Sequence, residues 1–198
     1  MSQVFFEKID HMFEEYLNYP VPALLLEEIR ETLSGFLLTE GQKDFQTDFP
    51  EGKKGEKLVK NLLVLKGYDF IRFNDTNEYD LLMGLLKNNE LQEVKFEVKT
   101  DFIAGPNNGG TKNIAIEEEC RGKKSGINVT AADFWVHLVP REKEIGFIKV
   151  NKLKDLISEL KSEGIGRLHE IGGDKASNTV NYLVPYTYFK SHFKVVSL

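Results

Sequence analysis

The stretch NEYDLLMGLLKNNELQEVKFEVKTD, residues 77–101, constrains the fold most, because it has the pattern of a β-hairpin whose register can be counted. Asn tolerates left-handed backbone, so Asn88-Asn89 predicts a two-residue turn. Counting outward from that turn places Asp80 directly opposite Glu97 on the facing strand. Directly opposed side chains share one face of a sheet, with Cβ atoms about 4.5–5.5 Å apart, so we expect these two acids to repel each other.

The two faces of the predicted hairpin differ in chemistry. Lys99 comes two residues after Glu97 and is expected on the face that carries the acids. The other face is expected to enter the core, and it carries Tyr79, Leu81, Met83, Leu85, Val94, Phe96 and Val98. Mg²⁺ suits an acid pair of this kind, because it prefers oxygen ligands and is commonly bound by one or two carboxylates together with substrate phosphate. A lysine beside it can orient the attacking water.

Glu56 is a third acid with two possible roles. A helix is predicted from Gly55 to Gly67, because glycine is a natural C-terminal stop. Glu56 continues the face of the apolar positions three and seven residues later, which would bring it towards the polar face of the hairpin. Alternatively, it only complements the helix dipole from the first turn.

The remaining segments predict an α/β fold with a mixed central β-sheet flanked by helices. Further strands are expected at residues 68–73, 113–117, 133–139, 143–150 and 180–189. Asn151 is expected to cap a helix that ends near residue 161. His137 lies within an apolar strand, so we expect a buried or edge residue there and no metal ligand.

Three regions are expected along the chain. Residues 1–39 have the pattern of two short amphipathic helices, an N-terminal arm or cap and a candidate dimer interface. Residues 40–54 are polar, with Pro and Gly, and predict a linker. Residues 55–198 form the expected main domain.

Composition restricts the class of protein. The single cysteine cannot form an internal disulfide, and neither a signal peptide nor a membrane span is recognisable, so we expect a soluble cytoplasmic protein. A net charge of −5 argues mildly against nucleic-acid binding, since such binding needs Lys and Arg facing phosphates. Basic residues nevertheless cluster locally.

Helix-borne Glu56, then Asp80, then Glu97-Val98-Lys99 at the end of the next strand resembles the PD-(D/E)XK nuclease superfamily, which includes restriction endonucleases, junction resolvases and phage recombination nucleases. The resemblance implies a restriction-endonuclease-like core in which Asp80, Glu97 and the Val98 carbonyl hold Mg²⁺, with Mn²⁺ as a possible substitute. It also implies that Lys99 assists the water and that Glu56 completes the metal site. Tyr79 stands where the named motif has proline.

The segment NIAIEEECRGKKSGINVTAADFWVH, from Asn113 to His137, is similar to phage-type members of this group. There a strand ending in glutamate is followed by a Ser-Gly-Ile loop and a Thr-x-x-Asp. This likeness makes Glu117 an additional candidate active-site acid. Candidate nucleic-acid contacts in and beside the segment are Lys112, Arg121, Lys123, Lys124 and Ser125, although a solvated charged loop explains the same residues equally well.

The expected function is therefore a Mg²⁺-dependent DNA endonuclease, a phosphodiester hydrolase and candidate homodimer that acts on junctions or in recombination or restriction. Two alternatives remain open. One is a catalytically inactive module of nuclease fold that binds nucleic acid or serves in assembly. The other is a hairpin that binds metal purely for structure, for which Lys99 would be an unhelpful neighbour. The sequence leaves the shape of the DNA substrate open.

Overall fold

The computed structural model describes residues 45–171 and 178–197, apart from residues 75, 77, 88 and 108. The expected N-terminal arm, and residues 40–44 of the expected linker, lie outside these residues. The elements are α3 (Phe45–Leu65), β1 (Asp69–Phe73), β2 (Leu81–Lys87), β3 (Glu90–Thr100), β4 (Asn113–Cys120), β5 (Lys123–Lys124), η1 (Gly126–Asn128), β6 (Phe134–Val139), η2 (Pro140–Glu142), β7 (Glu144–Lys149), α4 (Val150–Ser162), β8 (Arg167–Ile171), β9 (Thr179–Pro185), α5 (Tyr186–His192) and β10 (Lys194–Ser197).

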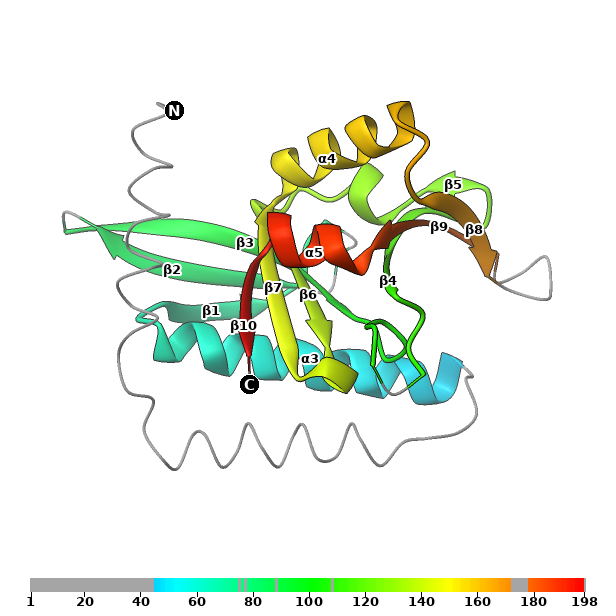
Figure 1. Cartoon of the computed structure of the whole chain (residues 1–198). Coiled ribbons are helices and arrows are strands. Elements are labelled where there is room, and N and C mark those ends of the chain that lie inside the picture. The colour runs from blue at the N-terminus through cyan, green and yellow to red at the C-terminus, as the bar shows by residue number, and fades with distance from the viewer. Residues whose placement is uncertain are drawn as a thin grey trace.

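The strands form two sheets in an α/β fold (Figure 1). The first sheet has six strands in the order β1-β2-β3-β6-β7-β10, and it is mixed because β3 and β6 run parallel while its other pairs are antiparallel. The second sheet has four antiparallel strands in the order β5-β4-β9-β8. The expected α/β fold with a mixed sheet is confirmed.

Helix α3 covers one face of the first sheet (Figure 1). Its apolar residues recur at the spacing of one helical face, and Leu58, Val59, Leu62 and Leu63 are all buried there. The helix stops before Gly67, whose φ of 85° suits glycine. It starts at Phe45, so the prediction of a linker is wrong for residues 45–54, which are helical. Pro and Gly lower the helix propensity of that stretch without excluding a helix.

The β2–β3 hairpin has the counted register over most of its length, with Leu81 opposite Phe96 and Lys87 opposite Glu90. The register changes at Asp80, whose N–H donates to the carbonyl oxygen of Phe96, the residue already opposite Leu81. Two residues therefore face one, as in a β-bulge. The expected direct pair of Asp80 with Glu97 does not form, because Asp80 and Leu81 both face Phe96. Counting from the turn could not predict this, since it assumes a regular strand.

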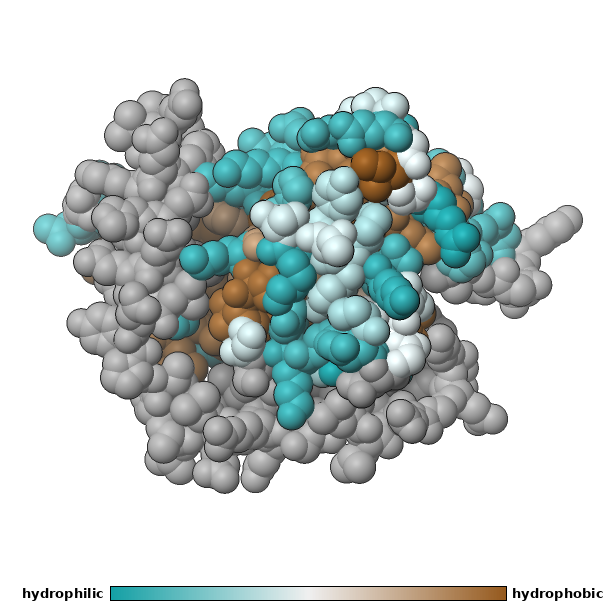
Figure 2. Space-filling view, viewed as in Figure 1, coloured by the Kyte–Doolittle hydropathy of each residue, from teal (hydrophilic) through white to brown (hydrophobic). Residues whose placement is uncertain are grey.

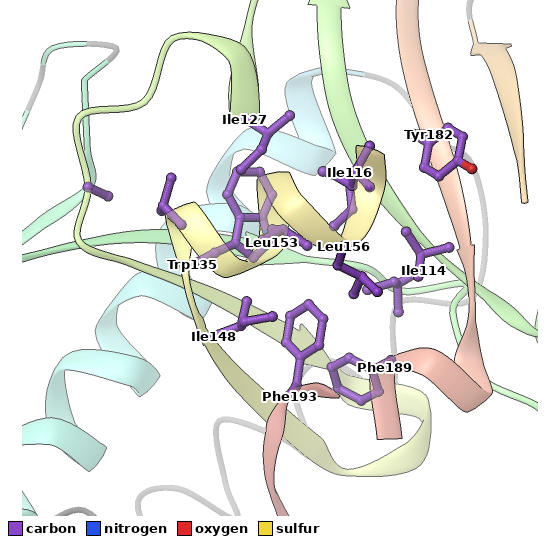
Figure 3. Packing of buried hydrophobic residues seen from close by; sticks show 14 of the residues in the cluster. Ile114, Ile116, Ile127, Trp135, Ile148, Leu153, Leu156, Tyr182, Phe189 and Phe193 are labelled. Carbon is purple, nitrogen blue, oxygen red and sulfur yellow. The ribbon is translucent and has the colours of Figure 1, made fainter. Parts of the chain in front are cut away.

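The shift also changes which core Tyr79 enters. Tyr79 is buried as expected, but it belongs to the cluster on the far side of the sheet, with Leu82. That second cluster joins the first sheet to α4, α5 and the second sheet. Figure 3 shows Leu153 and Leu156 of α4 over Trp135 and Ile116.

Helix α4 begins two residues earlier than an N-cap at Asn151 would give. Val150 is its first residue and its N–H donates to the carbonyl oxygen of Asp133, while Lys149 occupies the N-cap position, where its side chain makes no capping hydrogen bond. Asn151 is therefore not the N-cap. Figure 2 shows hydrophilic residues along the outer side of α4 and hydrophobic residues beneath it. None of the described helices is long and apolar enough to cross a membrane.

The strand expected at residues 180–189 is wrong in its second half. The chain leaves β9 at Pro185 and forms α5, which buries Tyr186 and Phe189 three residues apart. Aromatic residues three positions apart fit one face of a helix. The aromatic and β-branched residues of this segment also favour strands, so the sequence pattern did not show where the strand gives way to the helix. The last strand, β10, pairs with β7.

Candidate functional site

Asp80 lies at the start of β2, where the irregular backbone turns its carboxylate towards β3. Its Oδ2 accepts a hydrogen bond of 2.7 Å from the N–H of Val98. Among the described residues, no donor is bonded to Oδ1. Because the N–H and C=O of one strand residue point to the same side, the Val98 carbonyl points to this edge as well. One oxygen of Asp80 thus holds the backbone and the other stays available.

Glu97 and Lys99 form an ion pair on the face of β3 that carries the second core cluster. Lys99 Nζ lies 2.9 Å from Glu97 Oε1, and the side chains are 34% and 8% exposed respectively. Lys99 Nζ also lies 5.9 Å from the ring centre of Trp135 on β6. The lysine is thus held by a carboxylate and an aromatic face while part of it remains open.

The charges of this cluster influence one another. Burial raises the pKa of Glu97, the charge of Asp80 raises it further, and the Lys99 ammonium opposes both effects. Burial alone would lower the pKa of Lys99, but the charges of Glu97, Asp80 and Glu117 outweigh it and raise the pKa. Lys99 is therefore an ammonium group at neutral pH.

Glu56 of α3 approaches the same cluster from the other layer. It is buried, with 7% of the residue exposed, and Lys53 Nζ lies 2.9 Å from its Oε2. Burial raises the pKa of Glu56; the hydrogen bond from Lys53 opposes this and the charge of Asp80 adds to it. A Cβ atom on Gly55 would lie 2.1 Å from Thr100 Oγ1 of β3. The absence of a side chain at Gly55 lets the helix approach the strand and bring Glu56 close.

Thr130 lies in the candidate site, although the sequence had not indicated a role for it. Its hydroxyl oxygen lies 3.3 Å from Glu97 Oε2 and 3.0 Å from the carbonyl oxygen of Glu78, and it accepts a hydrogen bond from the N–H of Ala132. Thr130 therefore ties Glu97 to the segment that enters β2. It is the threonine of the Thr-x-x-Asp pattern, which was the available signal.

Glu117 lies on β4, and its charge acts on Lys99. The hydroxyl of Ser125 donates to Glu117 Oε1. Gly126 has a φ of 49°, and a Cβ atom there would lie 2.4 Å from the carbonyl oxygen of Glu117. The Ser-Gly-Ile loop therefore packs directly against this acid, and Ser125 is a partner of Glu117 in this structure.

The basic residues expected to contact nucleic acid fall into two places. Arg121, Lys123 and Lys124 are exposed at the β4–β5 turn, with Lys124 opposite Glu119. Lys112 is exposed too, but it lies just before β4, whereas Arg121 lies just after that strand. The eight residues of β4 separate Lys112 from Arg121 by roughly 25 Å. Only the first group forms a local basic cluster.

Asp101 joins the end of β3 to β4. Its Oδ1 accepts hydrogen bonds from the N–H groups of Ile103 and Ala104, and its Oδ2 accepts one from Ala115. His137 Nε2 lies 3.6 Å from Oδ2. Burial raises the pKa of Asp101, but His137 and these N–H groups lower it by more than burial raises it, so the net pKa is below its usual value. His137 is fully buried, as expected.

The donor set offers Mg²⁺ a small number of oxygen ligands. Within the described residues, no group of three or more His, Cys, Asp and Glu side chains is close enough to form a ready cage. Mg²⁺ does not need one, because it keeps several waters and commonly uses one or two carboxylates with substrate phosphate. The free Oδ1 of Asp80, the buried Glu97 and the nearby Val98 carbonyl fit that limited requirement.

No family model matches this chain, and no curated protein or solved structure is significantly similar to it.

Proposed function

We propose that this protein is a Mg²⁺-dependent DNA endonuclease with a PD-(D/E)XK-type site on a restriction-endonuclease-like core. The observation that carries the proposal is the convergence of Asp80, Glu97 and Lys99 where the start of β2 lies beside the end of β3, with their charges acting on one another. Perturbed acids of this kind gather at functional sites more often than elsewhere. Buried Glu56 adds a further acid from α3.

The roles follow from the chemistry of each group. Asp80, Glu97 and the Val98 carbonyl would hold the ion, with Glu56 and Glu117 as further acids near it. Mg²⁺ in such a site lowers the pKa of a bound water and stabilises charge on a phosphoryl oxygen. Lys99 keeps its proton at neutral pH, so it donates hydrogen bonds that orient the water or stabilise the phosphate. The ion pair with Glu97 neutralises part of the acid cluster before the ion binds.

Cleavage of labelled linear duplex, single-stranded and four-way-junction DNA tests the proposal, with Mg²⁺, Mn²⁺ or EDTA. Asp80→Asn and Glu97→Gln should each reduce the Mg²⁺-dependent rate by at least about a hundredfold. Glu93→Gln is the matched control, because it removes an exposed acid from the same strand. Cleavage that persists in EDTA, or in both site variants, would contradict the proposal.

Absence of cleavage on all three substrates would reject the enzyme. If DNA binding then stayed equal in the wild type and the variants, the molecule would be a binding or assembly module of this fold.

A further inference from the structure

Asn181 of β9 is a buried polar residue that the described structure leaves without a partner. Only 7% of it is exposed, yet among the described residues no group hydrogen-bonds to its side chain. Buried amides are normally hydrogen-bonded, so this exception calls for an explanation. The side-chain oxygen and nitrogen of Asn181 are not fully enclosed, because they are absent from the set of enclosed atoms without a partner in the described structure. The amide can therefore still be reached from the surface.

The register places Asn181 next to the candidate site. Asn181 is directly opposite Glu117 of β4 on one side and opposite His169 of β8 on the other. Its neighbours Tyr182 and Val184 point into the second core cluster, so Asn181 points to the other face of the sheet. Glu117, whose charge acts on Lys99, shares that face with it.

A polar row therefore crosses the second sheet, made of Ser125, Glu117, Asn181 and His169. The Ser125 hydroxyl already donates to Glu117. The Asn181 amide is a neutral donor that lies between Glu117 and the exposed His169. Asn side chains are among the groups that donate to DNA phosphates. A neutral donor suits a position beside Glu117, because a lysine or arginine there would pair with the acid.

We propose that Asn181 is a substrate-binding residue, whose carboxamide donates a hydrogen bond to a backbone phosphate of the DNA strand lying beside Glu97 and Lys99. This inference rests on the proposed function for its ligand, but its test does not need cleavage. The contact would extend the site from the first sheet onto the second, with the strand crossing the polar row.

Equilibrium binding in EDTA measures the contact with labelled linear duplex and four-way-junction DNA. Asn181→Leu should raise the Kd roughly three- to tenfold, as expected for one hydrogen bond, without lowering the melting temperature, since no intramolecular bond is removed. Asn113→Leu is the matched control: it makes the same change in the same sheet, where Asn113 donates to the Thr111 carbonyl. That control should lower stability and leave the Kd unchanged.

Single methylphosphonate substitutions in the DNA identify the phosphate. One position should weaken binding of the wild type but not of Asn181→Leu. An unchanged Kd in Asn181→Leu, equal losses in both proteins at every position, or a wild type that binds neither DNA would overturn the inference. Binding with this coupling but no cleavage in Mg²⁺ would support Asn181 and reject the nuclease.

Discussion

At the residue scale, the candidate site brings together carboxylates whose negative charges repel one another when no ligand is bound. Burial and the charge of Asp80 raise the pKa of both Glu56 and Glu97, while Lys53 and Lys99 offset part of the effect. Such an arrangement costs stability, because the charged form of each carboxylate is less favourable in the folded protein than in the unfolded chain. Sites with this cost are usually kept for function.

Glu56→Gln should therefore stabilise the ligand-free protein near neutral pH. A folded-state pKa above the unfolded value gives stability that is present below the unfolded pKa and is lost as pH rises through the folded one. The glutamine variant lacks that loss, so its free energy of unfolding should exceed that of the wild type by about 0.5–1 kcal/mol at pH 7.

Urea unfolding near neutral pH, and again below the ordinary carboxyl range, measures this difference. The advantage of Glu56→Gln should shrink at the lower pH, where Glu56 is protonated in both states. A loss of stability in Glu56→Gln at neutral pH, shrinking at the lower pH, would mean that the ion pair of Lys53 with Glu56 matters more than the burial of the charge.

At the scale of elements, the approach of α3 to β3 sets the position of Glu56. Gly55 lies against Thr100 Oγ1, a buried atom with no hydrogen-bond partner in the described structure. The other neighbours of a Cβ atom at Gly55 would be at ordinary contact distances of 3.5 Å. One atom of one side chain therefore limits the closeness of the two elements.

Gly55→Ala should destabilise the protein by about 1–3 kcal/mol, although alanine favours helices, because its Cβ would overlap Thr100 Oγ1. In a Thr100→Ala background the same change should be neutral or stabilising. Thr100→Val is the matched control, because it keeps an atom in the place of the hydroxyl. Additive effects of Gly55→Ala and Thr100→Ala in urea unfolding would contradict this account.

The elements also show why some features could be predicted and others not. The buried face of α3 and the register from Leu81 to Lys87 follow from periodicity and turn chemistry, which act locally. The bulge at Asp80 and the pairing of Glu117 with Asn181 depend on contacts between distant segments, which one sequence does not reveal. The candidate acids could be named from order, spacing and the family resemblance, but the contacts of Thr130 and the position of Asn181 opposite Glu117 needed the assembled strands.

At the scale of the whole molecule, the candidate site draws on both sheets and both cores. Asp101 bonds the end of β3 to Ala115 of β4, and the second core cluster packs the sheets together. The basic cluster of Arg121, Lys123 and Lys124 stands at the β4–β5 turn of the second sheet. In a chain of net charge −5, the proposed binding of DNA would depend on such local clusters for its attraction to phosphate.

Alanine at Arg121, Lys123 and Lys124 together should weaken DNA binding and reduce the slope of log K against log salt by up to about 3, one for each phosphate that the three side chains neutralise. Lys112→Ala, at the other end of β4, tests whether the distant lysine belongs to the same surface. Fluorescence anisotropy over a salt series gives both slopes. An unchanged slope in the triple variant would assign these residues to a solvated loop.

The proposed hydrolytic site of Asp80, Glu97 and Lys99 predicts a loss of DNA cleavage in Lys99→Met, which a Mg²⁺ titration measures. Removing the ammonium frees Glu97 for the ion, so Mg²⁺ should protect the variant against thermal unfolding at least as well as the wild type. Cleavage at saturating Mg²⁺ should nevertheless fall by about a hundredfold or more, with Lys95→Met as the control on the same strand. Wild-type cleavage rates in Lys99→Met would contradict the account.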